Sequence, residues 1–197
     1  MMNLEDYQTV FTVTILGLIL VAAFPTIRLY LPSGGEKFSE LWVLGPGHMA
    51  EDYPFNVVVG EEYRVFVGVG CHMGESTYYA VYVKFRNQTQ SLPNASASVP
   101  SSLVPLYEFR AFIGDGEGWE SQVNFTILDV SVGPNSTFVG HLSVNDVAFE
   151  VNCTATWDSE YEGYFYELFF ELWMYDNVVN GFQYHNRFVG IWLNMTV

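Results

Sequence analysis

The chain has 197 residues, half of them hydrophobic and 17% aromatic, which is enough for one domain of ordinary size with a small appendage. It carries 22 Asp and Glu against 7 Lys and Arg, and the resulting net charge of −15 repels phosphate backbones. These totals exclude a nucleic-acid partner. The acidity suits a solvated extracellular domain, a cation-rich setting or a basic partner, and does not distinguish among them.

The first part of the chain contains an uncharged segment, Thr9 to Ile27. A run of about 20 apolar residues matches the hydrocarbon thickness of a bilayer. The residues before it, MMNLEDYQ, contain no base, and VAAFP is a poor cleavage site for a secretory signal. We therefore expect a retained N-terminal transmembrane anchor over residues 1–31, which contacts the membrane through residues 9–27.

Two signals disagree about the side of the membrane on which the remaining chain lies. The positive-inside rule uses Arg28 and Lys37 to place it in the cytoplasm. Chance predicts about one or two N-x-[ST] sequons in a chain of this composition, and the excess found here indicates a glycosylated, exported surface. Long domains also translocate largely regardless of flanking charge. We expect a single-pass protein of the cell membrane with its C-terminal domain extracellular, and chance clustering of sequons is the alternative. The candidate glycosylation sites are Asn87, Asn94, Asn124, Asn135, Asn152 and Asn194.

After a short polar linker, residues 32–37, apolar residues alternate with a period of two, which is typical of strands. Strands are predicted at 62–70, 77–85, 106–113, 122–132, 136–144, 148–156, 164–176 and 182–197. The first two of these are predicted to pair as a hairpin, with Tyr79, Val81, Val83 and Phe85 inward and Lys84 and Arg86 outward.

The strand over 164–176 has Tyr166, Leu168, Phe170 and Leu172 on one parity and two glutamates on the other. Glu167 and Glu171 are four residues apart, so a helix is the alternative there; the aromatic density and the Asn180-Gly181 turn favour a strand. The last strand is predicted to change its inward parity near Gly190, as a bulge requires.

The whole pattern predicts an all-β fold over residues 38–197, an immunoglobulin-like antiparallel β-sandwich preceded by the transmembrane helix. Strands recur with Gly, Pro and Asn turns every eight to twelve residues, and no helix is predicted after the anchor. The Cys–Trp–Cys spacing of true immunoglobulin domains is absent. Cys71 and Cys153 form no C-x-x-C pair and are compatible with one inter-strand disulfide in an oxidising compartment. Two buried free thiols are the alternative.

The sequence shows no arrangement of residues that predicts catalysis. H-E-x-x-H, G-x-S-x-G and phosphate-binding loops are missing, and no His has a second ligand at metal spacing. We expect no catalytic residue, no cofactor and no metal site. The loop around Asp115 and Glu117, with Glu120, offers oxygens to calcium but lacks the alternating pattern of a calcium-binding loop.

The stretch from Phe38 to about Arg86 resembles the DUF1616 family, a domain of unknown function found in mostly archaeal membrane proteins. The resemblance rests on an F-[ST]-E start leading to L-G-P, an A-E-x-Y-P step and a V-G-E-E step. It departs from the family at Cys71, where an Asn is usual before His72, and in having a single hydrophobic segment. The matching residues are Phe38, Glu40, Leu44, Gly45, Pro46, Ala50, Glu51, Tyr53, Pro54, Gly60, Glu61 and Glu62.

The resemblance implies an extracytoplasmic sandwich on a membrane anchor, archaeal in origin, with no catalytic residue to carry over. We expect a non-enzymatic, glycosylated cell-surface protein that acts in interaction or envelope structure. One alternative is a subunit of a larger membrane complex or surface filament, in which the hydrophobic helix packs on partner helices or copies of the protein self-assemble. A further alternative is an extracytoplasmic metal or glycan binder, since the aromatic-rich tail provides rings on which sugars stack.

Overall fold

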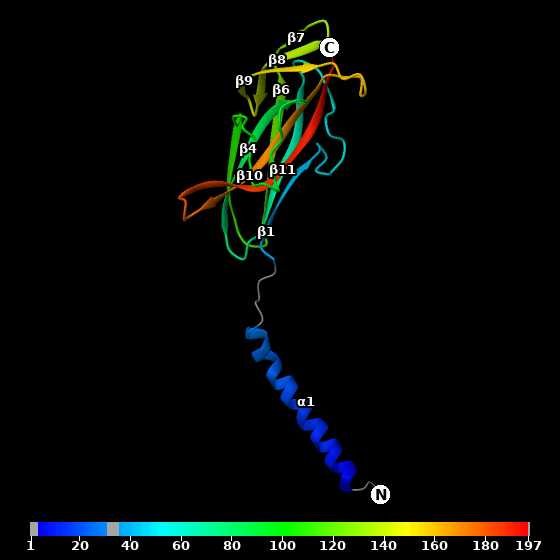
Figure 1. Ribbon diagram of the computed structural model, residues 1–197, viewed down its shortest axis with the longest axis vertical. Helices are drawn as coiled ribbons and strands as arrows, with labels where there is room; N and C mark the ends of the chain where they lie inside the picture. Colours follow the sequence, from blue (N-terminus) through cyan, green and yellow to red (C-terminus); the bar gives the residue numbers. More distant parts are fainter. Residues whose placement is uncertain (1–3, 31–35, 197) are drawn as a thin grey trace. The chain divides into compact units, whose positions relative to one another are not determined.

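A computed structural model describes residues 4–30 and 36–196, which divide into two units at Lys37 and Phe38 (Figure 1). The first unit contains one helix, α1 (Leu4–Tyr30). Within the described residues, no helix combines the length and the apolar character that crossing a membrane requires. Residues 32–35 of the predicted linker lie outside the described residues.

The second unit is built from β-strands, as the alternation predicted, and it contains two sheets (Figure 1). The segment 165–176 is a strand and not the helix that the spacing of its glutamates allowed. The strands are β1 (Phe38–Leu44), β2 (Asn56–Val57), β3 (Glu62–His72), β4 (Thr77–Asn87), β5 (Tyr107–Ile113), β6 (Gly118–Ile127), β7 (Val130–Val132), β8 (Ser136–Val144), β9 (Val147–Thr156), β10 (Phe165–Asp176) and β11 (Gly181–Met195).

Strands that follow one another in the chain often belong to different sheets. The first sheet has the order β1-β3-β6-β8-β7, with β9 also paired to β8, and the second has the order β2-β11-β10-β4-β5. Neighbours are antiparallel except β2, which is parallel to β11. The prediction that β3 and β4 form a hairpin is wrong, because the turn between them carries the chain from the first sheet to the second. A four-residue connection fits either arrangement, so its length does not distinguish them.

The core lies between the sheets and contains the residues whose parity predicted burial. Val65, Val67 and Val69 of β3 face the inward residues of β4 and β10, and all are almost completely buried. Burying each such side chain contributes about 1.5–3 kcal/mol relative to leaving it exposed. The inward residues of the second sheet are Tyr79, Val81, Val83 and Phe85 on β4 and Tyr166, Leu168, Phe170 and Leu172 on β10.

The β10–β11 pair contains an irregularity at a different place from the one predicted. The register shifts where Leu172 and Trp173 face Arg187 and Tyr184, so two residues of β11, His185 and Asn186, are extra. Asn186 has a φ of 55°, in the left-handed region that Asn tolerates. Gly190, where the shift was predicted, is needed for another reason. A Cβ there would lie 2.4 Å from Glu167 Oε1.

Two buried tyrosines connect the sheets, one at each end of the sandwich. The Tyr79 hydroxyl of the second sheet lies 2.6 Å from Ser39 Oγ of the first, and burial raises the pKa of Tyr79 to about 12. At the other end, the Tyr166 hydroxyl donates to Thr137 O (2.8 Å) and accepts from the Ala155 N–H (3.2 Å). These bonds fix the two sheets relative to each other at both ends.

We predict that Tyr166→Phe destabilises the domain by about 1–3 kcal/mol, because it leaves the buried Ala155 N–H and Thr137 carbonyl without a partner. The measurement is the free energy of unfolding of the full chain, from urea denaturation followed by tryptophan fluorescence. The matched control is Tyr161→Phe, which removes the same hydroxyl from a ring that is 69% exposed. Equal unfolding free energies for the two variants would contradict the assigned role.

Candidate functional site

Strand β10 is buried on both of its faces, although an antiparallel sheet usually leaves one face to solvent. Its outward parity contains Glu167 and Glu171, which are 5% and 0% exposed. The neighbouring strand β4 places Lys84 and Arg86 on the same outer face, and both are also buried. Carboxylates and cations are rarely buried unless they are paired, so the contacts between these four side chains decide what this face can do.

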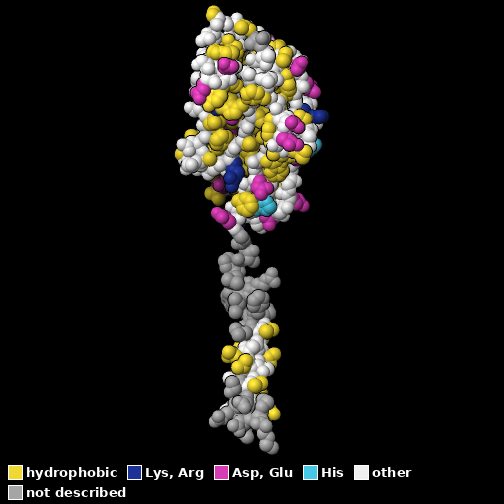
Figure 2. All heavy atoms as spheres, turned by 90° about the vertical axis from the view of Figure 1, so that its right-hand side faces the viewer, with side chains coloured by type: hydrophobic (Ala, Val, Ile, Leu, Met, Phe, Trp, Pro, Cys, Tyr) yellow, Lys and Arg dark blue, Asp and Glu magenta, His cyan; other side chains and the backbone are white. Residues whose placement is uncertain are grey.

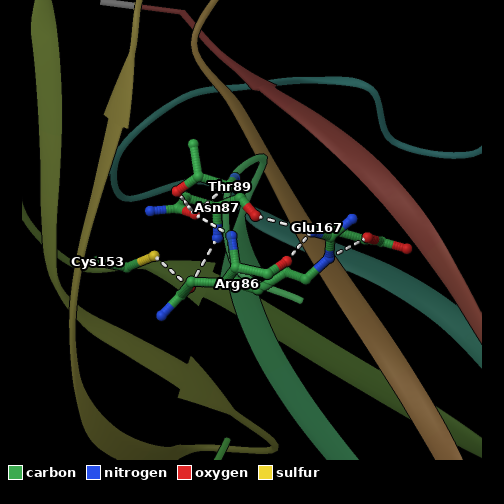
Figure 3. A network of polar contacts seen from close by, with 6 residues as sticks. Arg86, Asn87, Thr89, Cys153 and Glu167 are labelled. Carbon is green, nitrogen blue, oxygen red and sulfur yellow. Dashed lines mark hydrogen bonds and ion pairs between the residues drawn. The ribbon is translucent and has the colours of Figure 1, made fainter. Parts of the chain in front are cut away.

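Arg86 and Glu167 lie directly opposite each other on β4 and β10. Arg86 Nε donates to Glu167 Oε2 at 2.6 Å, and Nη1 donates to the carbonyls of Asn87 (3.1 Å) and Gln90. Figure 3 shows Arg86 beside Glu167, with Asn87 and Thr89 on its other side. The guanidinium also lies 4.9 Å from the centre of the Trp192 ring, within cation–π range. Burial raises the pKa of Glu167, and the contact with Arg86 opposes that rise.

Lys84 and Glu171 form the second pair, with Nζ and Oε2 2.9 Å apart. Lys84 Nζ also donates to the carbonyl of Ser101 (2.9 Å), while the Ser101 N–H donates to Glu171 Oε1 (2.8 Å). The Trp173 indole donates to Glu171 Oε2 at 3.1 Å. Ser101 belongs to the long β4–β5 connection, so this pair holds that connection against the sheet.

These two ion pairs are structural rather than catalytic in character. Each carboxylate has its cation within 3 Å and is closed off from solvent, so neither is positioned to meet a substrate or to exchange a proton with it. The sequence placed Lys84 and Arg86 on the outward parity of their strand and Glu167 and Glu171 on the outward parity of theirs. It gave no signal that the two strands are neighbours.

An aromatic cleft of about 450 Å³ lies at the Glu167 end of this face. The Phe165 ring packs against Phe55 at 6.1 Å and meets the edge of Tyr161 at 6.3 Å between ring centres. Asp158 lies beside the rings, and its Oδ1 accepts the N–H groups of Glu160 and Tyr161. Sequence reasoning missed the cleft because its parts come from four separate segments. Its lining residues are Phe55, Gln88, Asp158, Tyr161, Phe165 and Trp192.

An edge groove of about 600 Å³ continues from the cleft, and the two share Phe55 and Trp192. The groove lies between β1 of the first sheet and β11 of the second. Figure 2 shows hydrophobic side chains gathered across one face of the domain, with few basic ones among them. The lining residues of the edge groove are Leu41, Trp42, Val43, Tyr53, Phe55, Val189, Gly190, Ile191 and Trp192.

The predicted glycosylation sites differ in how free their side chains are. Asn94, Asn135 and Asn152 are exposed, whereas Asn87, Asn124 and Asn194 are half-buried. The amide nitrogen of Asn87 donates to Thr154 O (2.6 Å) and that of Asn194 donates to Asn56 Oδ1 (3.1 Å). The amide nitrogen of the exposed Asn152 donates to Glu150 Oε1, so hydrogen bonding alone does not separate the two groups. A glycan on Asn87 or Asn194 would have to fit at a half-buried position beside an existing hydrogen bond, so the exposed asparagines are the better acceptors.

The structure does not bring the calcium candidates together. Asp115 Oδ1 accepts the Gly74 N–H (2.8 Å) from the turn between β3 and β4, and Glu117 Oε2 accepts the Gly114 N–H (3.2 Å) within its own turn. Glu120 lies on β6 and contacts His48 Nδ1 at 2.7 Å. Across residues 4–30 and 36–196, no three His, Cys, Asp or Glu side chains lie where they could hold one metal ion together.

The predicted disulfide between Cys71 and Cys153 is wrong, because both residues are buried free thiols. Cys71 Sγ donates to the Glu75 carbonyl, just before β4 begins, whereas Cys153 Sγ contacts Gln90, just after β4 ends. The length of β4 therefore separates them, roughly 33 Å at the usual rise per residue. A disulfide needs Cα atoms about 4.4–6.8 Å apart. Burial raises the pKa of Cys153 to about 11, so that thiol is protonated at neutral pH.

The fold and the site together define a two-sheet β domain that is almost entirely antiparallel, with four buried charges neutralised in ion pairs and with an aromatic cleft and an apolar edge groove on its surface. Its sequence matches the family described as "Domain of unknown function (DUF1616)" over residues 32–134. This match covers more than half of the chain, and the protein belongs to the DUF1616 family, as the resemblance predicted. No curated protein matches the chain in sequence.

Two solved structures are distant matches to the chain. A CARDB domain from Pyrococcus furiosus, in complex with di-metal ions, is 10% identical with a TM-score of 0.43, over 83% of this chain and 91% of that one. A β-glucosidase from Listeria innocua, in complex with gluconolactone, is 9% identical with a TM-score of 0.41. That match covers 82% of this chain and 16% of the enzyme, so the chain spans a small part of the glucosidase.

We predict that Glu167→Gln destabilises the domain by about 3–5 kcal/mol, because it leaves the buried Arg86 without its counter-charge. The control is Glu108→Gln, which breaks the exposed pair with Arg110 and should cost at most about 1 kcal/mol. The measurement is the unfolding free energy of each variant. The double variant Arg86→Met with Glu167→Met should recover most of the loss, and a failure to recover would show that the two side chains are not coupled.

Proposed function

We propose that the protein is a membrane-anchored, glycosylated cell-surface protein whose β-sandwich has a non-enzymatic role in interaction or envelope structure. The observation that carries the proposal is the combination, in one chain, of an uncharged helical segment and a β domain with exposed glycosylation sequons. The character of the buried charges favours the non-enzymatic role, because the most enclosed carboxylates of the domain are occupied in ion pairs.

The anchor is supported by the side chains of α1. Apolar residues are exposed on every side of the helix over its described positions, from Val10 to Val21. The two threonines within this run donate their hydroxyls to carbonyls one turn earlier, Thr12 to Gln8 and Thr14 to Val10, each at 2.8 Å. A lipid environment favours such internal satisfaction of polar groups.

An immunoglobulin-like arrangement is supported by the order of the strands. β1, β3 and β6 lie side by side in one sheet, and β5, β4, β10 and β11 lie side by side in the other. The chain crosses between the sheets after β1, β2, β3, β5 and β9, and the crossings after β3, β5 and β9 resemble the Greek-key connections of immunoglobulin-like sandwiches. The hairpin of β8 and β9 is then an addition to the first sheet.

Glycosylation is tested by intact-mass analysis after expression in a host that glycosylates exported proteins. We expect added glycan mass, and we expect Asn94→Gln and Asn135→Gln each to remove part of it because both asparagines are exposed. The control is Asn87→Gln, which should leave the glycan mass unchanged, since its amide nitrogen is hydrogen-bonded within the domain. An unglycosylated product from such a host would overturn the extracellular part of the proposal.

A second candidate function, binding of a glycan, is favoured by the aromatic cleft. Trp192 and Tyr161 expose their rings at its opening, 41% and 69% respectively. Asp158 also lines the cleft, and its Oδ1, not its Oδ2, accepts the two N–H groups of the turn. Exposed rings beside a carboxylate provide apolar faces for a sugar and an acceptor for its hydroxyls.

The test of glycan binding is calorimetric titration of the full chain with oligosaccharides selected on a glycan array. We predict that Tyr161→Ala weakens binding at least about tenfold, which corresponds to ~1.4 kcal/mol. Phe112→Ala is the control, since it removes another exposed ring, 73% exposed, from outside the cleft. Equal affinities in the two variants would exclude the cleft as the site.

A further inference from the structure

Strand β11 has one open edge. Along one side it pairs with β10 from Gly181 to Asn194, apart from the extra residues His185 and Asn186, while on the other side β2 pairs only with Asn194 and Met195. Among the described residues, no strand is hydrogen-bonded to that second side from Gly181 to Leu193, although β1 of the first sheet lies across the edge groove from it. An uncovered edge presents unpaired N–H and C=O groups that another strand can join.

The hydrogen bonds at the end of β11 identify the groups that point outward. The Asn194 N–H donates to Phe55 O (2.6 Å) on the open side, and the Met195 N–H donates to Tyr164 O (3.0 Å) on the β10 side. Successive residues of a strand alternate in this respect. Phe188, Gly190 and Trp192 therefore direct their N–H and C=O groups to the open edge.

The unpaired stretch of this edge has a definite limit at each of its two ends. At one end the extra residues His185 and Asn186 interrupt the strand, and at the other end Phe55 occupies the edge opposite Asn194. The interval between these limits is residues 187–193, and its middle residue is Gly190. It has no proline and only Arg187 as a charged residue, so it lacks most of the features that keep edge strands apart.

We propose that this interval pairs with the same interval of a second copy of the chain, antiparallel and two-fold symmetric about Gly190. Phe188 then lies opposite Trp192 of the second copy, and Gly190 opposite Gly190. Three pairs of residues exchange about six backbone hydrogen bonds, and the two β11 strands join the second sheets of both copies into one. A strand centred elsewhere would meet the bulge or Phe55 and leave part of the interval unpaired.

Side chains and charge favour a second copy over another partner. Phe188 and Trp192 make an aromatic cross-strand pair on the outer face, and Gly190 leaves room between them. Val189 and Ile191 line the edge groove, so the neighbouring strand closes that groove. Two chains of charge −15 repel each other, but residues 177–197 contain no Asp or Glu. This edge is therefore a place where two copies can approach without bringing carboxylates of β11 together.

The first test uses the unaltered full chain in mild detergent and amide hydrogen exchange at several protein concentrations. We expect the amides of Gly190 and Trp192 to gain protection as the concentration rises. The amides of Val189 and Ile191 are the internal control, since they face β10 and stay protected throughout. Association through α1 alone would leave Gly190 and Trp192 unprotected. Concentration-independent exchange of these two amides would overturn the proposal, as would protection that comes from a co-purified peptide.

The second test reads the register by disulfide formation. We expect a mixture of Phe188→Cys and Trp192→Cys chains to form a covalent dimer under mild oxidation, because directly opposite residues have suitable Cα separations. Either variant alone should not, since identical positions lie four residues apart along the strands, roughly 13 Å. Val178→Cys, at a hairpin position that is 94% exposed, measures random collision. Dimer formation by one variant alone, or none above the Val178→Cys level, would overturn the register.

Discussion

The pairing of Arg86 with Glu167 and of Lys84 with Glu171 is the constraint on which the second sheet depends. Strand β10 carries a carboxylate at every second outward position of its middle section, and both are buried. This arrangement is tolerable because β4 supplies a cation to each carboxylate: Arg86 lies directly opposite Glu167, and Lys84, which is opposite Phe169, reaches Glu171 diagonally. The Lys84–Glu171 pair also holds the β4–β5 connection in place through Ser101, and Arg86 of the other pair lies against the Trp192 ring. Trp192 in turn lines both the aromatic cleft and the edge groove.

Much of the fold follows from local pattern. Alternation predicted most strands and the inward residues of β3, β4 and β10, because a half-buried strand must place its apolar side chains on one face. The Asn145-Asp146 turn is also visible in the sequence, and both residues have positive φ values, 47° and 64°, as the tight hairpin between β8 and β9 requires. Family membership was evident from the residues around Phe38 to Glu62.

The features that the sequence did not predict all depend on which strands become neighbours in the fold. The chain between β3 and β4 is short enough for a hairpin, yet it crosses to the other sheet. The same crossing places Cys71 and Cys153 at opposite ends of β4, which is why the disulfide prediction failed. Arg86 and Glu167 are 81 positions apart, and the aromatic cleft draws on Phe55, Gln88, Tyr161 and Trp192. Such contacts arise from long-range topology, which local periodicity does not contain.

The burial of Lys84 and Arg86 also shapes how a population of these domains would behave in a crowded layer. Two of the five Lys and Arg residues after Lys37 are hidden inside ion pairs, so Arg64, Arg110 and Arg187 are the bases left on a surface with many carboxylates. Such domains act as polyanions whose mutual repulsion reaches about one Debye length, ~8–10 Å at physiological ionic strength. Because each buried cation is neutralised by a buried glutamate, the excess of negative charge stays on the surface, and the surrounding salt would set the spacing of such a layer.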